Sequence, residues 1–470
     1  MKELLNYLCK FFIYKFNMKW GEIMKKFSKV LLIMGLIMMI MSQSVMADSS
    51  TVSSEVKRAE SPSAWAIWDI QMSNVYNLGT IENYKNYTNV VISDQFLAIE
   101  ESFESRFNIT DESKLSKDVN ITRGNVVEEF YDIIQATLEL ENLDGDTKNE
   151  ALTYFIDQGL INGRGNDNYA LEDECTNQEM LVLAKRVYDH LIYSLELDAK
   201  GAFWTVSDED NTVYLLGSIH ATDGSVYPMS KEILDAFNSS SALAVEANIL
   251  SPSQEDTAYI QQIMMLEGDT TIDQLISEDT YKKYVEILSP YGIAPEVYNK
   301  LKPWYGAMVV QNLQMANQSY NAAMGVDLYF LSMATGRKSI IELEGIKYQI
   351  DMFDSFSAEL QEGYLMSVLE GEEASNDLMG QMLKDWKSGD MEDLEQLVFA
   401  ETEEESELEK EFNEKLWDVR NAHMVEKVLD MLEQDSENDY FLVVGAGHML
   451  NDNGIVESLR NLGYEVEQVK

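Results

Sequence analysis

The stretch VYLLGSIHATDG, from Val213 to Gly224, joins an apolar run to a glycine and to a histidine three positions later. The segment YFLVVGAGHMLNDNG, which begins at Tyr440, repeats this arrangement near the other end of the chain. An apolar run that ends at a glycine predicts a buried strand followed by a tight turn. The carboxyl ends of strands are where α/β sheets build their sites. We therefore expect His220 and His448 to face a shared cleft.

A histidine at the end of a strand has a simpler alternative, a hydrogen-bonded structural role. The chain of 470 residues contains only 4 histidines. Two of them, His220 and His448, each follow an apolar run and a glycine three positions earlier, and this shared pattern favours the functional interpretation. The other two, His190 and His423, lie in helical patterns and are interpreted as structural.

The sequence beyond residue 197 alternates short β-rich runs with long amphipathic stretches. This pattern predicts a mixed α/β domain from about Ala202 to Lys470. The closing NGIVESLRNLGYEVEQV predicts a helix that stops at Gly463, followed by a last strand. The other expected strands are Val213–Leu216, Leu243–Val245, Ile340–Ile341 and Tyr440–Val444.

Carboxylates also follow apolar runs in this domain. Glu246 ends SALAVEAN and Glu344 ends SIIELEG, and an acid directly after a buried strand is unfavourable unless it lies at the strand mouth or is paired. Asp327 follows Gly325 at the start of an expected helix, where a simple helix N-terminal charge is the alternative.

Two histidines with one or two carboxylates form a plausible set of ligands for a divalent metal ion. Nitrogen and oxygen donors suit Zn²⁺, Mn²⁺, Co²⁺ or Fe²⁺, and an open position would hold water. The ion would lower the pKa of that water and polarise a substrate carbonyl. A remaining glutamate would accept the proton as a general base. The spacing along the chain leaves open which of Glu246 and Glu344 is the ligand.

The N-terminus has the pattern of an export signal. A basic stretch after Met24, a short apolar run and the small residues before Ala47 predict a secretory signal over residues 1–47, with translation starting at Met24. Residues 48–60 predict a flexible leader. We expect a secreted protein without stable membrane insertion after cleavage.

Composition limits the partners of the chain. The formal net charge is −47, which predicts a surface that repels nucleic acid and anionic membranes. Such a surface attracts cations or basic peptides, although improved solubility is the simpler interpretation.

Residues 61–197 predict small helical modules. The stretch SAWAIWDIQMSNVYNLG has helical spacing and ends in glycine, and Thr176 with Glu179 forms a capping box before a later helix. With the GLING turn and the ITRG helix opening, the region resembles the S-layer homology modules of bacterial surface proteins. The helix openings match only in part. The resemblance implies an all-α region that binds cell-wall polysaccharide, and a helical spacer without a ligand is the alternative.

The region from Ala202 to Lys470 resembles the TraB/GumN family, which also includes the Tiki proteases. The resemblance rests on the two Gly-x-x-His segments and on GVDLYFLSMATGRKSIIELEGIKYQIDMF, with its Gly-x-Asp helix, Leu-Glu strand end and glutamine-containing helix. It also includes the Arg-Asn pair of VRNAHMVEKVL. The resemblance implies a metal-dependent hydrolase.

The resemblance also assigns roles to residues. The metal ligands would come from His220, His448, Glu246 and Glu344. Catalytic roles would fall to Glu246, Glu344 and Arg420, and Arg420 would either hold a substrate carboxylate or neutralise the glutamates. Substrate contacts are expected from Asp327, Arg420 and Asn421.

These observations together predict an exported hydrolase that acts on a peptide or related amide at the cell surface. Two alternatives stay open. The domain could sequester a peptide signal without cleaving it, or the protein could be a structural component of the wall.

Overall fold

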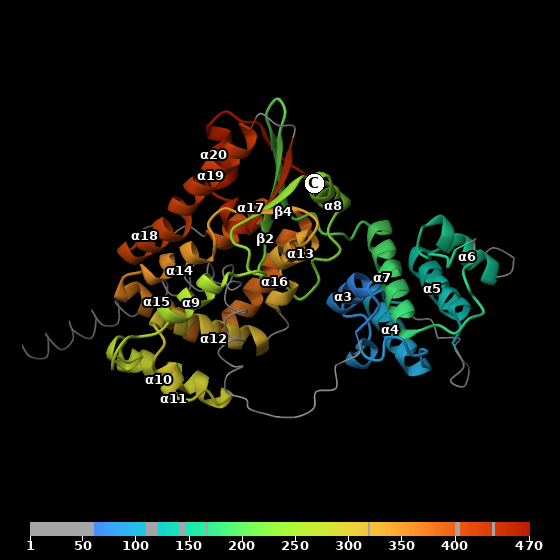
Figure 1. Cartoon of the computed structure of the whole chain (residues 1–470), viewed down its shortest axis with the longest axis horizontal. Helices are drawn as coiled ribbons and strands as arrows, with labels where there is room; N and C mark the ends of the chain where they lie inside the picture. Colours follow the sequence, from blue (N-terminus) through green and yellow to red (C-terminus); the bar gives the residue numbers. More distant parts are fainter. Residues whose placement is uncertain are drawn as a thin grey trace, which may run out of the picture. The chain divides into compact units, whose positions relative to one another are not determined.

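The computed structural model describes residues 61–109, 121–140, 147–165, 168–317, 320–399, 405–434 and 438–470 (Figure 1). The expected signal and leader, residues 1–60, lie outside the described residues. The described chain forms two compact units. One contains residues 61–198 together with Gly224–Pro228, and the other contains Ala199–Asp223 and Met229–Lys470. No helix of the described residues is long and apolar enough to cross a membrane.

The first unit is helical, as the sequence predicts. Thr176 and Glu179 form the expected capping box at the start of its last helix, where the Glu179 carboxylate accepts hydrogen bonds from the Thr176 backbone N–H and hydroxyl. Aromatic side chains fill the core, including Phe96, Phe103 and Phe130. The elements are α3 (Ile67–Val75), η2 (Ile81–Tyr84), α4 (Ser93–Phe107), α5 (Arg123–Leu138), α6 (Thr147–Asp157) and α7 (Asn177–Ser194).

The second unit is built on a six-stranded mixed sheet of order β4-β3-β5-β2-β1-β6. The four strands from β4 to β2 are parallel to one another, while β1 runs antiparallel to β2 and β6 antiparallel to β1. All five predicted strands are present, and β1 is an additional strand. The strands are β1 (Ala202–Ser207), β2 (Thr212–Ser218), β3 (Ala242–Val245), β4 (Ser339–Glu342), β5 (Asp439–Gly445) and β6 (Val466–Gln468).

The register brings the carboxyl ends of the four parallel strands to one edge of the sheet. Ser218 of β2 pairs with Gly445 of β5, and Val245 of β3 pairs with both Val443 of β5 and Glu342 of β4. The residues that follow these strands therefore emerge side by side. The sequence contains the predicted histidines and glutamates at these positions.

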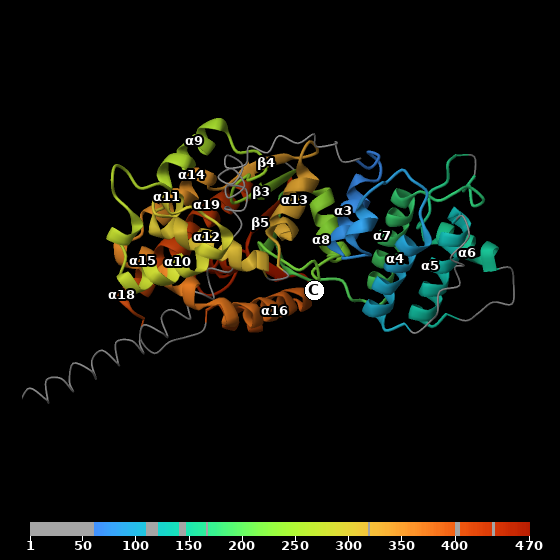
Figure 2. The same cartoon turned by 90° about the horizontal axis from the view of Figure 1, so that it is seen from below.

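Helices cover the sheet and hold its end loops. Helices α8 (Lys231–Ser239) and α13 (Val326–Ala334) pack on the strands (Figure 2). The ring centroids of Phe237 and Phe330 lie 5.1 Å apart, and those of Phe330 and Phe441 lie 4.8 Å apart. One continuous helical segment runs through α18 (Glu407–Asn413), the π-helix η6 (Glu414–Asp418) and α19 (Val419–Leu432). A π-helix inside a longer helix is frequent at functional sites.

The remaining helices of this unit include η7, which carries His448. They are α9 (Gln254–Ile263), η3 (Ile272–Gln274), α10 (Glu278–Leu288), η4 (Ser289–Tyr291), α11 (Pro295–Tyr298), α12 (Pro303–Asn317), η5 (Ala322–Met324), α14 (Ile346–Asp354), α15 (Ala358–Glu370), α16 (Glu372–Ser388), α17 (Met391–Val398), η7 (Ala446–His448) and α20 (Ile455–Asn461).

Candidate functional site

His220 lies two residues beyond β2 and is held from behind by a carboxylate. Its Nδ1 lies 2.7 Å from Oδ2 of Asp327, whose Oδ1 accepts a hydrogen bond of 2.6 Å from the Ser218 hydroxyl. An ionised carboxylate only accepts hydrogen bonds, so Nδ1 of His220 carries the proton. The other ring nitrogen, Nε2, is thereby left as the functional atom. A buried carboxylate behind an imidazole is the usual way of fixing the tautomer of a metal-binding histidine.

A glycine allows Asp327 to reach this position. The backbone of Gly325 approaches the carbonyl of His220 so closely that a Cβ atom there would lie 2.3 Å from the carbonyl oxygen. The Val326 N–H then donates to the Ile219 carbonyl at 3.0 Å, which anchors the start of α13 beside β2. The Gly-x-Asp pattern is thus a packing requirement that delivers a carboxylate to the rear of His220.

His448 is held in the same manner by an amide. Its Nδ1 lies 2.6 Å from Oδ1 of Asn421, and Nδ2 of Asn421 donates to the carbonyl of Asn453 at 2.9 Å. Because the Asn421 nitrogen is committed as a donor, its oxygen must accept, and Nδ1 of His448 carries the proton. The lone pair of neutral His448 therefore resides on Nε2.

Trp417 of the π-helix supports the ring of His448. The two ring centroids lie 4.9 Å apart in an edge-to-face arrangement. A Cβ atom at Gly447 would lie only 2.4 Å from the indole, so a glycine is required between the two rings. The second Gly-x-x-His segment thus ends in a 3-10 turn packed beneath Trp417.

Glu246 brings a carboxylate oxygen to the two histidines. Its Oε1 accepts a hydrogen bond of 2.7 Å from the Gly445 N–H and lies 3.9 Å from Nε2 of His448. A Cβ atom at Gly445 would lie 3.3 Å from Nε2 of His220 and 3.4 Å from Oε1 of Glu246. Glycine at the end of β5 therefore leaves a small space that both side chains face.

Arg420 of α19 is fully buried between the two glutamates. Its Nε and Nη2 donate to the two oxygens of Glu344 at 2.8 Å each, and Nη2 also donates to Oε2 of Glu246 at 2.7 Å. Of the two expected roles of Arg420, the structure supports the neutralisation of the glutamates. Both oxygens of Glu344 are bound to Arg420, which is the position of an ion-pair partner rather than of a metal ligand.

The environment sets the protonation states of the three facing side chains. Burial opposes the protonation of His220, but the Asp327 carboxylate outweighs it and raises the pKa of His220. Burial, and then the charge of Arg420, lower the pKa of His448 to about 3. Burial alone would raise the pKa of Glu246, but Arg420 and the two histidines lower it. At neutral pH His448 is therefore neutral and Glu246 is ionised.

The donor types fit a transition metal, because two imidazole nitrogens and a carboxylate oxygen converge and both rings are locked through Nδ1. Within the described ranges, no three or more His, Cys, Asp or Glu side chains lie close enough together to hold a metal ion. Among the same residues, Nε2 of His220 and Nε2 of His448 form no hydrogen bond.

The structure places the expected substrate contacts beside the histidines. Asp327 contacts His220 and Asn421 contacts His448, so both side chains orient a ring, and a contact with substrate stays a prediction. Two residues of the site were not predicted. Ser218 supports Asp327, and Gln349, expected only as part of a helix motif, donates to both glutamates. A small polar residue at a strand end and a glutamine within a helix give no signal that separates them from structural residues.

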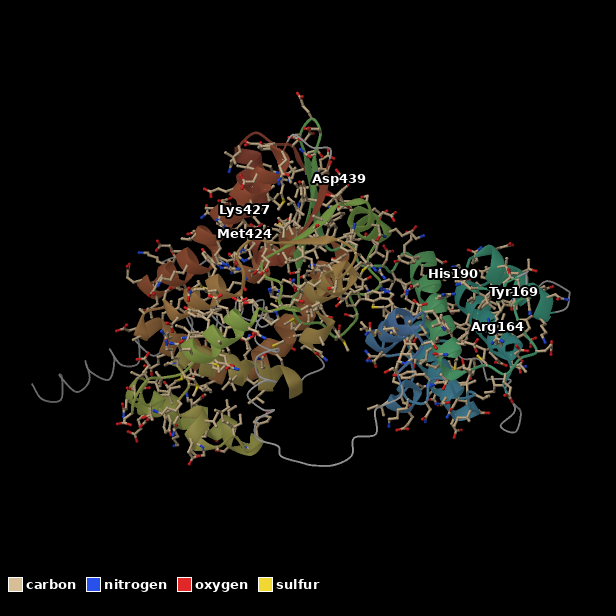
Figure 3. All side chains as sticks on the ribbon, viewed as in Figure 1. Arg164, Tyr169, His190, Met424, Lys427 and Asp439 are labelled. Atoms are coloured by element: carbon tan, nitrogen blue, oxygen red, sulfur yellow. The ribbon has the colours of Figure 1, made fainter. Side chains whose placement is uncertain are left out.

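The remaining histidines have structural positions. His190 on α7 lies in the helical unit, where its Nε2 is 2.7 Å from the Tyr154 hydroxyl (Figure 3). His423 donates from Nε2 to the Leu343 carbonyl at 2.9 Å.

We expect Asp327→Asn to lower the pKa of His220 below its wild-type value, because the carboxylate that opposes the effect of burial is lost. With four histidines in the chain, NMR of ¹⁵N-labelled imidazoles can follow each titration. The control Asp354→Asn removes a carboxylate that pairs with Lys302 and no histidine. An unchanged His220 titration in Asp327→Asn would contradict this assignment.

Arg420→Met should destabilise the fold by about 3–5 kcal/mol, because it leaves two buried carboxylates without their cation. Adding Glu344→Gln should recover part of this loss, since one of the two facing charges is then removed. Urea unfolding of the wild type, both single variants and the double variant measures the coupling. Strictly additive losses would show that the two side chains do not act as a pair.

The comparisons with known proteins identify a family for the second unit. Residues 202–468 match the TraB/PrgY/gumN family. The chain is 22% identical over 316 residues to Metalloprotease TIKI1 of Xenopus tropicalis, covering 56% of this chain and 60% of that protein. It is 36% identical over 64 residues to the Metalloprotease TIKI homolog of Nematostella vectensis, covering 14% of each. An uncharacterized protein of Treponema pallidum is 21% identical over 183 residues, covering 38% of this chain and 54% of that protein.

The matches also have limits. The chain spans about 60% of the length of the TIKI1 relative. No solved structure matches the chain. The family match begins at residue 202, and the comparisons give no support to the resemblance of residues 61–197 to S-layer homology modules. Because the match covers more than half of the chain, this protein belongs to the TraB/PrgY/gumN family.

Proposed function

We propose that this protein is a metal-dependent hydrolase that cleaves a peptide or a related amide. The observation that carries the proposal is the convergence of Nε2 of His220, Nε2 of His448 and Oε1 of Glu246 at the ends of three adjacent parallel strands. The distant similarity to the TIKI metalloproteases supports the same chemistry.

His220, His448 and Glu246 are the residues that would hold the ion. A bound divalent metal ion supplies a Lewis acid that lowers the pKa of water and polarises a carbonyl. Asp327 and Asn421 keep the proton of each imidazole on Nδ1, so that both Nε2 atoms stay available. Arg420 keeps Glu246 ionised. Glu344 is less suited to act as the general base, because both of its oxygens accept hydrogen bonds from Arg420. One of these bonds would have to break before Glu344 could accept a proton.

A protein that binds a peptide without cleaving it remains the second candidate for the same domain. The buried, hydrogen-bonded rings favour the hydrolase, because pure peptide capture does not require two imidazoles with fixed tautomers. Turnover of peptides separates the two candidates.

The purified full-length protein should contain close to one transition metal ion per chain. The double variant His220→Ala/His448→Ala should lose it, because two of the three proposed donors are removed. Metal analysis and titration calorimetry measure the binding, and cleavage of a peptide library measures turnover. Circular dichroism controls for folding. Equal, weak metal uptake by the two folded proteins would reject the metal site and favour peptide capture.

We also propose that the protein is exported and that its helical unit binds a wall polysaccharide. The support is a cavity of about 420 Å³ in that unit, lined by Trp65, by Arg123, Arg164 and Arg186, and by Glu179. Each of the three guanidinium groups is paired with a carboxylate of the same unit: Arg123 with Glu179, Arg164 with Glu179 and Asp173, and Arg186 with Asp69. Trp65 is 58% exposed and offers an apolar face to a sugar ring.

Arg164→Ala should weaken binding of the full-length protein to a purified wall polysaccharide that carries carboxylates by about tenfold or more, because a charge-assisted hydrogen bond is lost. A sedimentation or calorimetric assay measures the affinity. Lys85→Ala removes a similarly exposed cation of the same unit that pairs with Glu82 outside the cavity. Equal affinities for the wild type and both variants would exclude this cavity as the binding site, and no binding by the wild type would show a spacer without a ligand.

A further inference from the structure

Gln349 is the glutamine of the helix motif noted in the sequence, and that motif does not show what its side chain contacts. It lies on α14 with only 1% of its surface exposed. Its Nε2 donates to Oε2 of Glu246 at 2.7 Å and to Oε2 of Glu344 at 3.0 Å. One amide nitrogen from a separate helix therefore joins the carboxylates that follow β3 and β4.

Arg420 makes the matching pair of contacts from the other side. Its Nη2 donates to the same two oxygens, at 2.7 Å for Glu246 and 2.8 Å for Glu344. Two carboxylate oxygens and two nitrogen donors therefore alternate around a closed ring of four atoms. Both donors lie between oxygens of like charge, which would otherwise repel each other at close range.

The orientation of the Gln349 amide follows from this ring. Its Oε1 is buried and has no hydrogen-bond partner among the described residues. Turning the amide over would point that oxygen at two carboxylates, which is worse than leaving it unpaired. A buried acceptor without a partner is unfavourable and calls for an explanation. The simplest one is that Gln349 is required for the donor at Nε2.

We propose that Gln349 is a positioning residue that commits Oε2 of Glu246 to the ring and leaves Oε1 to face the two histidines. The proposal rests on the proposed metal-dependent function. Without Nε2 of Gln349, only Nη2 of Arg420 would donate to both Oε2 of Glu246 and Oε2 of Glu344. Repulsion between the two oxygens would then turn the Glu246 carboxylate and move Oε1 away from the Gly445 N–H and from the space beside His220.

The test compares Gln349→Met with a matched control in the same unit. Methionine is close to glutamine in length and carries no donor. Gln314 is a suitable control because it is also buried, 8% exposed, and its Nε2 donates at 3.1 Å to the Val368 carbonyl outside the ring. Zn²⁺ titration calorimetry on the full-length proteins gives the first readout. Gln349→Met should weaken the Zn²⁺ affinity about 10- to 100-fold, the usual effect of losing a residue that orients a ligand. Gln314→Met should leave the affinity unchanged.

Crystal structures of the metal-free wild type and Gln349→Met give the second readout. The Glu246 carboxylate should turn in the variant and lose the hydrogen bond from Gly445. An unchanged Glu246 orientation, or an unchanged Zn²⁺ affinity in a protein that binds Zn²⁺, would overturn the proposal. If the wild type binds no metal, the proposed function fails, and the two metal-free structures still decide whether Gln349 positions Glu246.

Discussion

The site depends on a fully buried guanidinium. Arg420 binds Glu344 with two nitrogens and Glu246 with one of them, and in this way it ties α19 to the ends of β3 and β4. Removing one partner of a buried charge network leaves another charge uncompensated, so each of these residues requires the others. The ion pairs therefore fix where α19 lies on the sheet, and this position places Asn421, the next residue, behind His448.

The sheet and the helices contribute different parts of the site. Parallel strands bring the functional side chains to one edge, because the register places the ends of β2, β3, β4 and β5 side by side. Helices then fix the orientation of each side chain, with Asp327 of α13 behind His220 and Asn421 of α19 behind His448. The order of the strands alone would bring the two imidazoles together, but it would not determine which nitrogen of each ring carries the proton. The helices select the nitrogen that faces the cleft.

The sequence predicted the strands and the edge on which the site lies, because a buried strand that ends in glycine leaves a strong local pattern. It also identified the two histidines and the two glutamates by their place after those strands. It did not distinguish the roles of Glu246 and Glu344, since hydrogen bonds from Arg420 and Gln349 separate them and both partners come from distant helices. It assigned Asp327 and Asn421 to substrate for the same reason, because a helix sequence does not show which neighbouring ring its side chain will meet. The S-layer resemblance rested on short partial motifs that any small helical module can contain.

The charges of the cluster explain why an ion would be favourable there. When both imidazoles are neutral, with Nε2 free, Glu246, Glu344 and Asp327 carry three negative charges against the one positive charge of Arg420. Two negative charges then remain in a buried environment, where an uncompensated charge is unfavourable. The chain tolerates this because Oε1 of Glu246 is solvated by a single backbone N–H, that of Gly445. A cation held by the two free imidazole nitrogens would offset the remaining charge, and a ligand that binds only the folded state also stabilises that state. The same electrostatic imbalance that weakens the empty cluster is thus a reason for it to bind a cation.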